Sequence, residues 1–234
     1  MAINGLSLSQ NYKWYRSKPS VVVDIRDKAE YPRDDEDTFI RIYADQVIEW
    51  FLNFGRDLHY NAGFVVLQIA MSQIEGIQQY WEGKSSKDGP GKCFRRGAKR
   101  ILKLDKPADS WLKDLYNDAR CGLFHDGMTR HRILVDNDRA HAIEHDPIDG
   151  YIIISPKKLL GAVRADFTKY IDALRNNSDP PRRQLFVQLW RQRHPMAQIA
   201  QTPAATQAVP SGRNLGPTSV DPRGPGPSGA GPLK

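Results

Sequence analysis

The chain has 234 residues, of which 40% are hydrophobic and 26% charged, a balance that is ordinary for a globular protein and excludes a wholly disordered chain. Its net charge of +7 is unevenly spread, because residues 1–91 hold 10 Lys and Arg against 13 Asp and Glu, whereas residues 92–234 hold 24 against 14. A basic half of this kind favours a polyanionic partner, most often nucleic acid; the alternative is a basic surface that only keeps the protein in solution.

Residues 1–37 are polar and mixed in character, and we interpret them as an N-terminal extension with one short strand at 20–25. The acidic run at 34–37 comes where a helix is expected to begin, because carboxylates favour the positive end of the helix dipole. Asp37 or Thr38 can cap that helix.

Four helices are predicted by apolar residues that recur at steps of three and four. They span about 38–58, 62–82, 92–103 and 109–126, and Gly127 follows the last of them, where a left-handed residue is often required. The second helix is apolar around most of its circumference, which predicts a place in the middle of a bundle. The inward stripe of the first helix is expected to comprise Ile40, Tyr43, Val47, Trp50, Phe51, Phe54 and Leu58.

Directly after Gly127 the apolar residues no longer recur at steps of three and four. Short apolar runs separated by turn-forming residues predict a small β-hairpin or a two- or three-stranded β-meander, inserted at about 131–154. Ser155 and Pro156 suit the cap and the first position of another helix, which extends to about residue 175. A last helix is expected over about 181–193.

The end of the chain, residues 196–234, is predicted to be disordered. Between Pro203 and Lys234, 13 of the 32 residues are Gly or Pro and none is aromatic, so little apolar surface is available to offset the entropy of ordering. The sequence as a whole predicts a mainly α fold, namely an antiparallel helical bundle over residues 38–195 with a small β-insertion and a disordered tail.

Neither a membrane segment nor a secretion signal is expected. The longest apolar runs, at 64–67 and 151–154, are far shorter than the roughly 20 residues that span a bilayer, and residues 1–15 lack an apolar core. The two cysteines, Cys93 and Cys121, cannot form a disulfide framework. We therefore expect a cytoplasmic protein with free thiols.

The most informative motif lies near the end of the fourth helix, where Arg120 and His125 are five residues apart. On a regular α-helix this offset is about 140°, so the two side chains would not share a face unless the helix loosens near Gly122 or ends before His125. The alternative is an ordinary surface arginine and a helix-terminal histidine.

The pattern Arg-x-x-x-x-His at this place resembles the signature of the HEPN superfamily (higher eukaryotes and prokaryotes nucleotide-binding domain). The resemblance covers about residues 38–175 and implies an up-and-down α-bundle. It also implies a metal-independent endoribonuclease that acts as a homodimer, in a toxin–antitoxin, defence or RNA-processing system, with Arg120 and His125 as the catalytic pair. The chain departs from the family pattern at Cys121, where members often carry a polar residue.

Several other residues are candidates to support the pair or to bind RNA. Glu75, inside the apolar second helix, matches the polar residue that family members carry on an earlier helix, and Cys121, Asp118 and Asp126 adjoin the motif. The third helix holds six cations and no carboxylate, so it is the expected nucleic-acid-binding face, with a solvated face as the alternative. These cations are Lys92, Arg95, Arg96, Lys99, Arg100 and Lys103.

The implied chemistry needs neither metal nor cofactor. The 2′-hydroxyl of RNA can act as an internal nucleophile, a histidine can take or give its proton, and a guanidinium can hold the phosphate through two contacts. Because one chain supplies a single pair, a dimer would bring two.

Two further patterns are rejected. The run His141-Ala142-Ile143-Glu144-His145 resembles an inverted zinc-protease motif, but its flanks indicate a strand, on which the histidines would lie about 13 Å apart. The run from Gly89 to Lys92 lacks the first glycine and the Ser or Thr of a phosphate loop.

Two alternatives to the ribonuclease stay open. One is a non-catalytic module on the same bundle that binds RNA or nucleotides, such as an antitoxin, a regulator or a phage accessory protein. The other is a structural interaction protein. A cysteine nucleophile at Cys121 is a remote third option, because no histidine–carboxylate set accompanies it.

Overall fold

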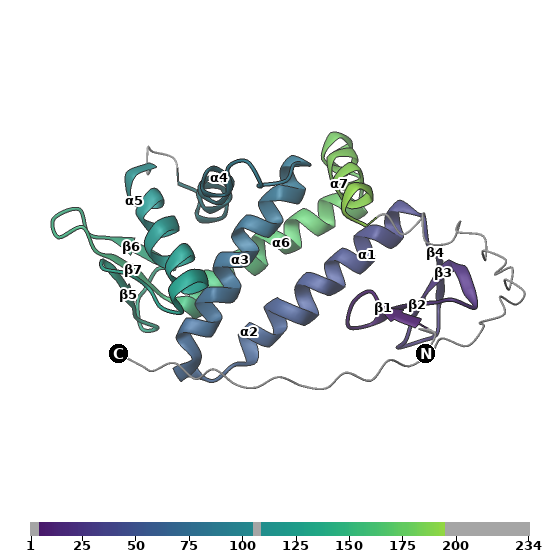
Figure 1. Cartoon of the computed structure of the whole chain (residues 1–234), viewed down its shortest axis with the longest axis horizontal. Helices are drawn as coiled ribbons and strands as arrows, with labels where there is room; N and C mark the ends of the chain where they lie inside the picture. The colour runs from purple at the N-terminus through teal and green to yellow at the C-terminus, as the bar shows by residue number, and fades with distance from the viewer. Residues whose placement is uncertain (1–4, 105–108, 195–234) are drawn as a thin grey trace, which may run out of the picture.

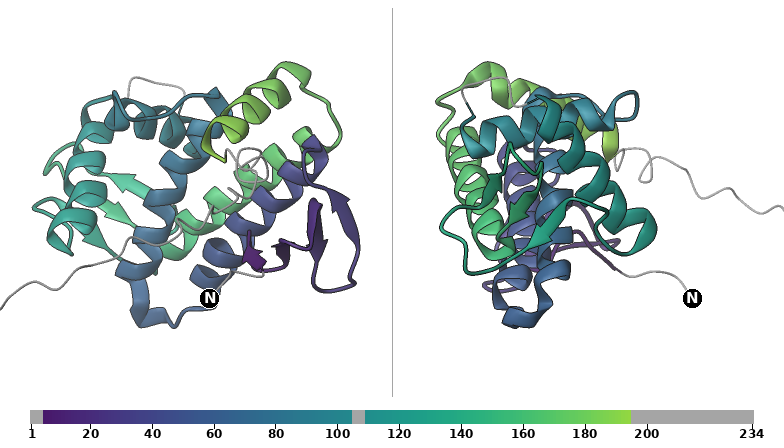
Figure 2. Two further views of the ribbon diagram at one scale, coloured as in Figure 1. Left: turned by 45° about the vertical axis from the view of Figure 1, so that its right-hand side comes forward. Right: turned by 90° about the vertical axis from the view of Figure 1, so that its left-hand side faces the viewer.

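A computed structural model describes residues 5–104 and 109–194. Helices form the middle of the molecule, and two small sheets lie at its opposite ends (Figures 1 and 2). The fold is therefore mixed α/β, and the prediction of a mainly α bundle is wrong. The strands are β1 (Gly5–Ser7), β2 (Tyr12–Tyr15), β3 (Lys18–Asp24), β4 (Glu30–Pro32), β5 (Ile133–Val135), β6 (Ile143–His145) and β7 (Ile152–Ile154). The α-helices are α1 (Glu36–Val47), α2 (Phe54–Asp57), α3 (Gly63–Glu82), α4 (Pro90–Leu102), α5 (Asp109–Asp114), α6 (Pro156–Arg175) and α7 (Pro180–Arg193).

The N-terminal residues form a four-stranded antiparallel sheet in the order β1-β2-β3-β4, where the sequence predicted only one strand. The missed signal is the alternation in β2, where Tyr12 and Trp14 are buried and Lys13 and Tyr15 are partly exposed. Such short strands carry little periodic pattern by themselves. They are stabilised here because Tyr12 and Val22 belong to the same apolar core as the helices.

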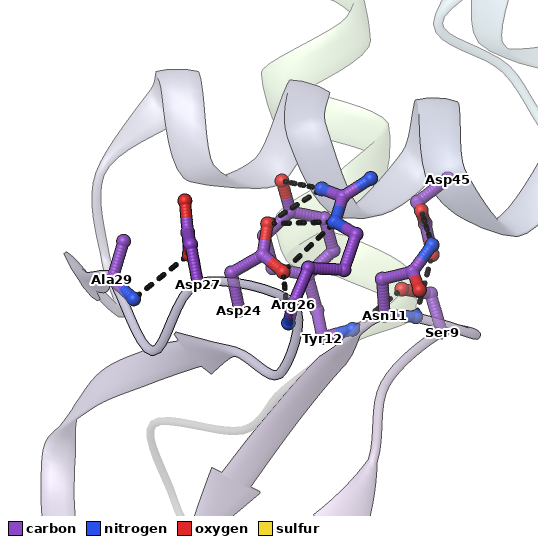
Figure 3. Close-up of polar contacts among 8 residues, drawn as sticks. All are labelled: Ser9, Asn11, Tyr12, Asp24, Arg26, Asp27, Ala29 and Asp45. Carbon is purple, nitrogen blue, oxygen red and sulfur yellow. Dashed lines mark hydrogen bonds and ion pairs between the residues drawn. The ribbon is translucent and has the colours of Figure 1, made fainter.

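Polar contacts join this sheet to α1 (Figure 3). The backbone N–H and the side-chain amide of Asn11 both donate to the Asp45 carboxylate, at 2.9 and 2.7 Å.

A second set of polar contacts lies within the sheet region. Arg26 donates to the buried Asp24 carboxylate through Nε, at 2.9 Å, and to the Tyr12 hydroxyl, at 3.3 Å. The hydrogen bond from Arg26 lowers the pKa of Asp24. This contact therefore stabilises the fold at neutral pH and is lost as the pH falls through the folded-state pKa.

Helix α3 is the centre of the helical part, as its all-round apolar surface predicted. It packs against α4, α6 and α7, and six of its apolar side chains are completely buried. These are Val66, Leu67, Ala70, Met71, Ile74 and Ile77. Aromatic rings extend this core between α1, α3 and α7, where Tyr43 lies 4.3 Å from Tyr80 and 5.3 Å from Phe186, centroid to centroid.

The first predicted helix is interrupted by a π-helical segment, η1 (Ile48–Asn53), between α1 and α2. A π-turn contains one more residue than an α-turn, so the side chains that follow it are rotated relative to the expected stripe. Ile40, Tyr43 and Val47 are buried as predicted, whereas the inward placement of Trp50, Phe51 and Phe54 is wrong, because all three are exposed.

The second sheet has the order β5-β7-β6, in which β5 is parallel to β7 and β6 is antiparallel to it. The region is β-structured as predicted, but it is a hairpin with a parallel third strand and not a meander. The third strand is held because the buried Ile133 and Ile152 pair across β5 and β7 and face the helical core.

The helix boundaries follow the predicted signals closely. Asp35, rather than Asp37 or Thr38, caps α1 by accepting from the Thr38 N–H at 3.0 Å. Pro156 occupies the first turn of α6. Gly127 follows the helical segment that ends at Asp126 and has a φ of 76°. The predicted disordered tail lies outside the described residues.

Helices α3 and α4 approach closely at Gly97, which gives a testable prediction. A Cβ at this position would lie 2.7 Å from the Ile74 carbonyl oxygen. We expect Gly97→Ala to lower the free energy of unfolding by about 1–3 kcal/mol, because the helices must separate. The matched control is Gly161→Ala on α6, where a Cβ meets nothing within 4 Å. There alanine should stabilise by about 0.5–1 kcal/mol. Urea unfolding of both variants measures this, and equal stabilities would contradict the close approach.

Candidate functional site

Arg120 and His125 lie on a π-helical segment, η3 (Leu115–Asp126), which continues α5. In a π-helix each N–H bonds to the carbonyl five residues earlier, so a turn is wider than in an α-helix and residues five apart lie nearer to the same face. The segment ends at Gly127, which adopts a left-handed conformation. The looser helix thus reduces the offset that a regular α-helix would place between the two side chains. Such segments are frequent at functional sites.

Arg120 forms an ion pair with Glu75 of α3, with 3.0 Å between Nη2 and Oε2. Both side chains are largely enclosed, with exposures of 20% for Arg120 and 9% for Glu75. The Ser86 hydroxyl, in the loop after α3, donates to the other carboxylate oxygen of Glu75 at 2.7 Å. The structure therefore brings together Arg120 and Glu75, two of the residues that the sequence singled out.

This ion pair is not aligned as a hydrogen bond. Among the described residues, Arg120 Nε and Glu75 Oε2 are buried polar atoms without a hydrogen-bond partner. Buried atoms of this kind are uncommon, since an unmet hydrogen bond costs about 1–3 kcal/mol. The pair is therefore held by charge attraction and packing, and these two atoms keep an unmet hydrogen bond inside the protein.

Aromatic rings fix the Arg120 side chain from two sides. The guanidinium carbon lies 4.5 Å from the ring centroid of Phe124 and 5.8 Å from that of Tyr116. Tyr116 in turn packs 5.5 Å from Phe94 of α4, centroid to centroid. Burial, with a smaller contribution from the adjacent Cys121, raises the pKa of Tyr116 to about 12. The phenol therefore stays neutral at physiological pH.

His125 is exposed at the end of η3. The two acidic residues of the motif make their main contacts with Arg130, and the charge of His125 adds a smaller effect on Asp126. Asp126 forms an ion pair with Arg130, which lowers the pKa of Asp126. Asp118 accepts the Arg130 backbone N–H at 2.8 Å through its own backbone carbonyl. Both contacts fold the chain after η3 back onto the helix, through the side chain of Asp126 and through the backbone carbonyl of Asp118.

The basic helix α4 is less available to RNA than its composition suggested. Arg96 forms an ion pair with Glu82, and Arg100 forms one with Asp166. Arg100 also lies 4.2 Å from the centroid of the Trp81 ring. Arg95 and Lys99 are half-buried, so the exposed cations outside these ion pairs are Lys92 on α4 and Lys103, which directly follows the helix as its C-cap.

The two rejected motifs lie in ordinary secondary structure. Glu144 and His145 belong to β6, as their flanks indicated, and His145 stacks on Trp111. Gly89 precedes α4 and Lys92 lies in its first turn, so this run starts a helix. Within residues 5–104 and 109–194, no group of three or more His, Cys, Asp or Glu residues is placed to hold a metal ion.

Apart from Glu75, the sequence did not identify the residues that position Arg120. In the sequence, Tyr116 and Phe124 are ordinary residues of a predicted helix, and no pattern indicates their contact with Arg120. No pattern indicates Ser86 either, because its contact with Glu75 depends on the path of a loop. The sequence feature that indicated an ion pair is the carboxylate of Glu75 in an apolar helix, since a buried charge requires a partner.

Comparison with known proteins adds no identification. No protein-family model, no curated protein and no solved structure matches this chain. In the part of the chain that the structure describes, no helix is both long enough and apolar enough to span a bilayer.

Proposed function

We propose that this protein is a metal-independent endoribonuclease of the HEPN type, with Arg120 and His125 as its catalytic pair. The observation that carries the proposal is that Arg120 and His125 lie on one π-helical segment, whose wider turn brings them closer to a common face than an α-helix would, with Arg120 enclosed by Glu75 and Phe124. A cytoplasmic location goes with this proposal, because Cys93 and Cys121 are free thiols.

The reaction transfers a phosphoryl group within the RNA. A histidine takes the proton from the 2′-hydroxyl, whose oxygen then forms a bond to the adjacent phosphorus. The bond from phosphorus to the 5′-oxygen breaks, and that oxygen receives a proton from a protonated histidine. Arg120 offsets the charge that develops on the phosphate. The products are a 2′,3′-cyclic phosphate and a 5′-hydroxyl end.

The direct test is incubation of the purified protein with total RNA in the presence of a chelator, with wild type and His125→Ala compared. Cleavage by the wild type alone supports the proposal. The absence of cleavage by either protein, with RNA still bound, favours the second candidate, a non-catalytic RNA- or nucleotide-binding module. The observation that favours that candidate is the engagement of Arg120 by Glu75, together with Cys121 directly after it.

The proposed site is expected to be completed by a second copy of the chain, because one chain contributes one arginine and one histidine. Phe124 and Met128 are exposed apolar residues that flank His125, at 41% and 62% exposure. Surfaces of this kind favour association. We therefore expect a homodimer in solution with η3 near the two-fold axis.

Light scattering tests this interface. Met128→Glu should convert the dimer into a monomer, because a carboxylate would be buried without a partner. Ile148→Glu is the matched control, since Ile148 is 91% exposed in a turn of the second sheet. A monomeric wild type, or a dimeric Met128→Glu variant, would contradict the arrangement.

RNA binding should depend on the exposed cations of α4. Each phosphate contact on a single strand contributes about −0.7 to the slope of log affinity against log salt. We expect the double variant Lys92→Gln, Lys103→Gln to flatten that slope and weaken binding, whereas Lys169→Gln on α6 should change neither. Filter binding at several salt concentrations measures the slopes. If the double variant binds like the wild type, α4 is only a solvated face.

A further inference from the structure

A cavity of about 320 Å³ is lined by residues of β3, α1 and α7 and of the segments beside them. In Figure 1 these three elements lie on the side of the molecule away from α5, the helix that η3 continues. Its walls include the buried side chains of Val22, Phe39, Ile42 and Trp190. The volume is within the range of roughly 300–1,000 Å³ that is usual for small-molecule sites. The proposed RNA chemistry uses none of these residues.

The walls of the cavity are held by contacts that do not involve a ligand. Gln46 donates to the Leu8 carbonyl at 2.6 Å, and Asn11 is bound to Asp45, so the sheet is tied to α1 on one side (Figure 3). On the other side the Phe39 and Trp190 rings stack at 5.9 Å between centroids. A preformed cavity avoids part of the ordering cost of binding.

The charged residues at this cavity favour an anion. Arg33 and Arg191 contribute two cations, against one carboxylate from Asp34. The Arg33 guanidinium is already engaged, since it donates to the Pro19 carbonyl at 3.2 Å and lies over the Trp14 ring. It therefore acts through its charge. Arg191 is 59% exposed, and its nearest carboxylate, Glu36, lies 3.9 Å away, so its guanidinium has donors available for a ligand.

His194 completes the rim. Its ring stacks on Trp190 at 3.9 Å between centroids, and Nδ1 lies 3.1 Å from the Trp190 carbonyl. Burial lowers the pKa of His194, so the ring is neutral at physiological pH. The residues that line the cavity thus combine apolar walls with two arginines and one aspartate, and Glu36 lies beside Arg191.

We infer that this cavity binds a small amphipathic anion, such as an aromatic or aliphatic carboxylate or sulfonate, with its apolar body between Ile42 and Trp190 and its anionic group at Arg191. This inference is independent of the proposed ribonuclease site.

A pair of fluorescent probes tests the site and the charge separately. 1-Anilinonaphthalene-8-sulfonate carries an anionic group on an apolar body, and N-phenyl-1-naphthylamine is its neutral counterpart. We expect the full-length protein to bind the sulfonate and decanoate to displace it. Arg191→Gln should weaken sulfonate binding about tenfold, the effect of losing one charge-assisted hydrogen bond, and should leave the neutral probe unaffected.

Two further variants locate the site. Arg175→Gln removes the same charge from the exposed end of α6 and should bind both probes like the wild type. Leu8→Trp, at the cavity wall, should reduce the binding of both probes. The inference is overturned if the sulfonate does not bind, if Arg191→Gln binds it as well as the wild type does, or if the neutral probe binds more tightly than the anion.

Discussion

Replacement of His125 by alanine should reduce RNA cleavage by roughly 10²–10⁴-fold, which is the usual contribution of a positioned general acid or base. The side chain is exposed, so the free energy of unfolding should change by no more than about 0.5 kcal/mol. RNA affinity should also be kept, because the histidine acts on a proton and not on the backbone charge. Single-turnover cleavage of a labelled RNA in chelator measures the rate, and urea unfolding measures the stability.

The matched control is His141→Ala, which removes an exposed histidine from the turn before β6. It should cleave at the wild-type rate and leave the same 2′,3′-cyclic phosphate ends. Equal losses of cleavage rate in the two variants would indicate an effect that is not specific to His125. An unchanged cleavage rate in His125→Ala would contradict the catalytic role proposed for this residue.

The second large effect concerns stability. Glu75→Ala should lower the free energy of unfolding by about 3–5 kcal/mol, because it leaves the Arg120 charge enclosed without its partner. The Ser86 hydroxyl also loses its acceptor. Thermal and urea unfolding measure this loss, and a fall of less than about 1 kcal/mol would show that the pair is solvated, as surface ion pairs are.

The double variant Glu75→Leu, Arg120→Met separates stability from function. Replacing both charged partners with apolar groups of similar size is often neutral, so this protein should regain much of the lost stability. It should still fail to cleave RNA, because the phosphate has lost its guanidinium. A double variant that cleaves RNA would exclude Arg120 from the catalytic pair.

The elements that the sequence predicted well are those with a long apolar period. The helix predicted over 62–82 is α3, Gly63–Glu82, and the helix predicted from Pro156 to about residue 175 is α6, Pro156–Arg175. A stripe repeated over 20 residues, with a Gly or Pro at its boundary, specifies a helix locally. Short strands such as β1 and β4 carry three residues each, and no local pattern could specify them.

The chain by itself therefore determined which segments are helical, that Glu75 is a charge inside an apolar helix, and that Arg120 and His125 are five residues apart. Tertiary structure decided the rest. The offset between Arg120 and His125 depends on the π-helical backbone of η3, and the placement of Arg120 depends on a carboxylate 45 positions away in the sequence. Tertiary structure also decided that Arg96 and Arg100 form ion pairs with carboxylates of other helices. The physical reason is that local periodicity records only which face of a segment is apolar, whereas ion pairs and sheet order depend on which segments meet.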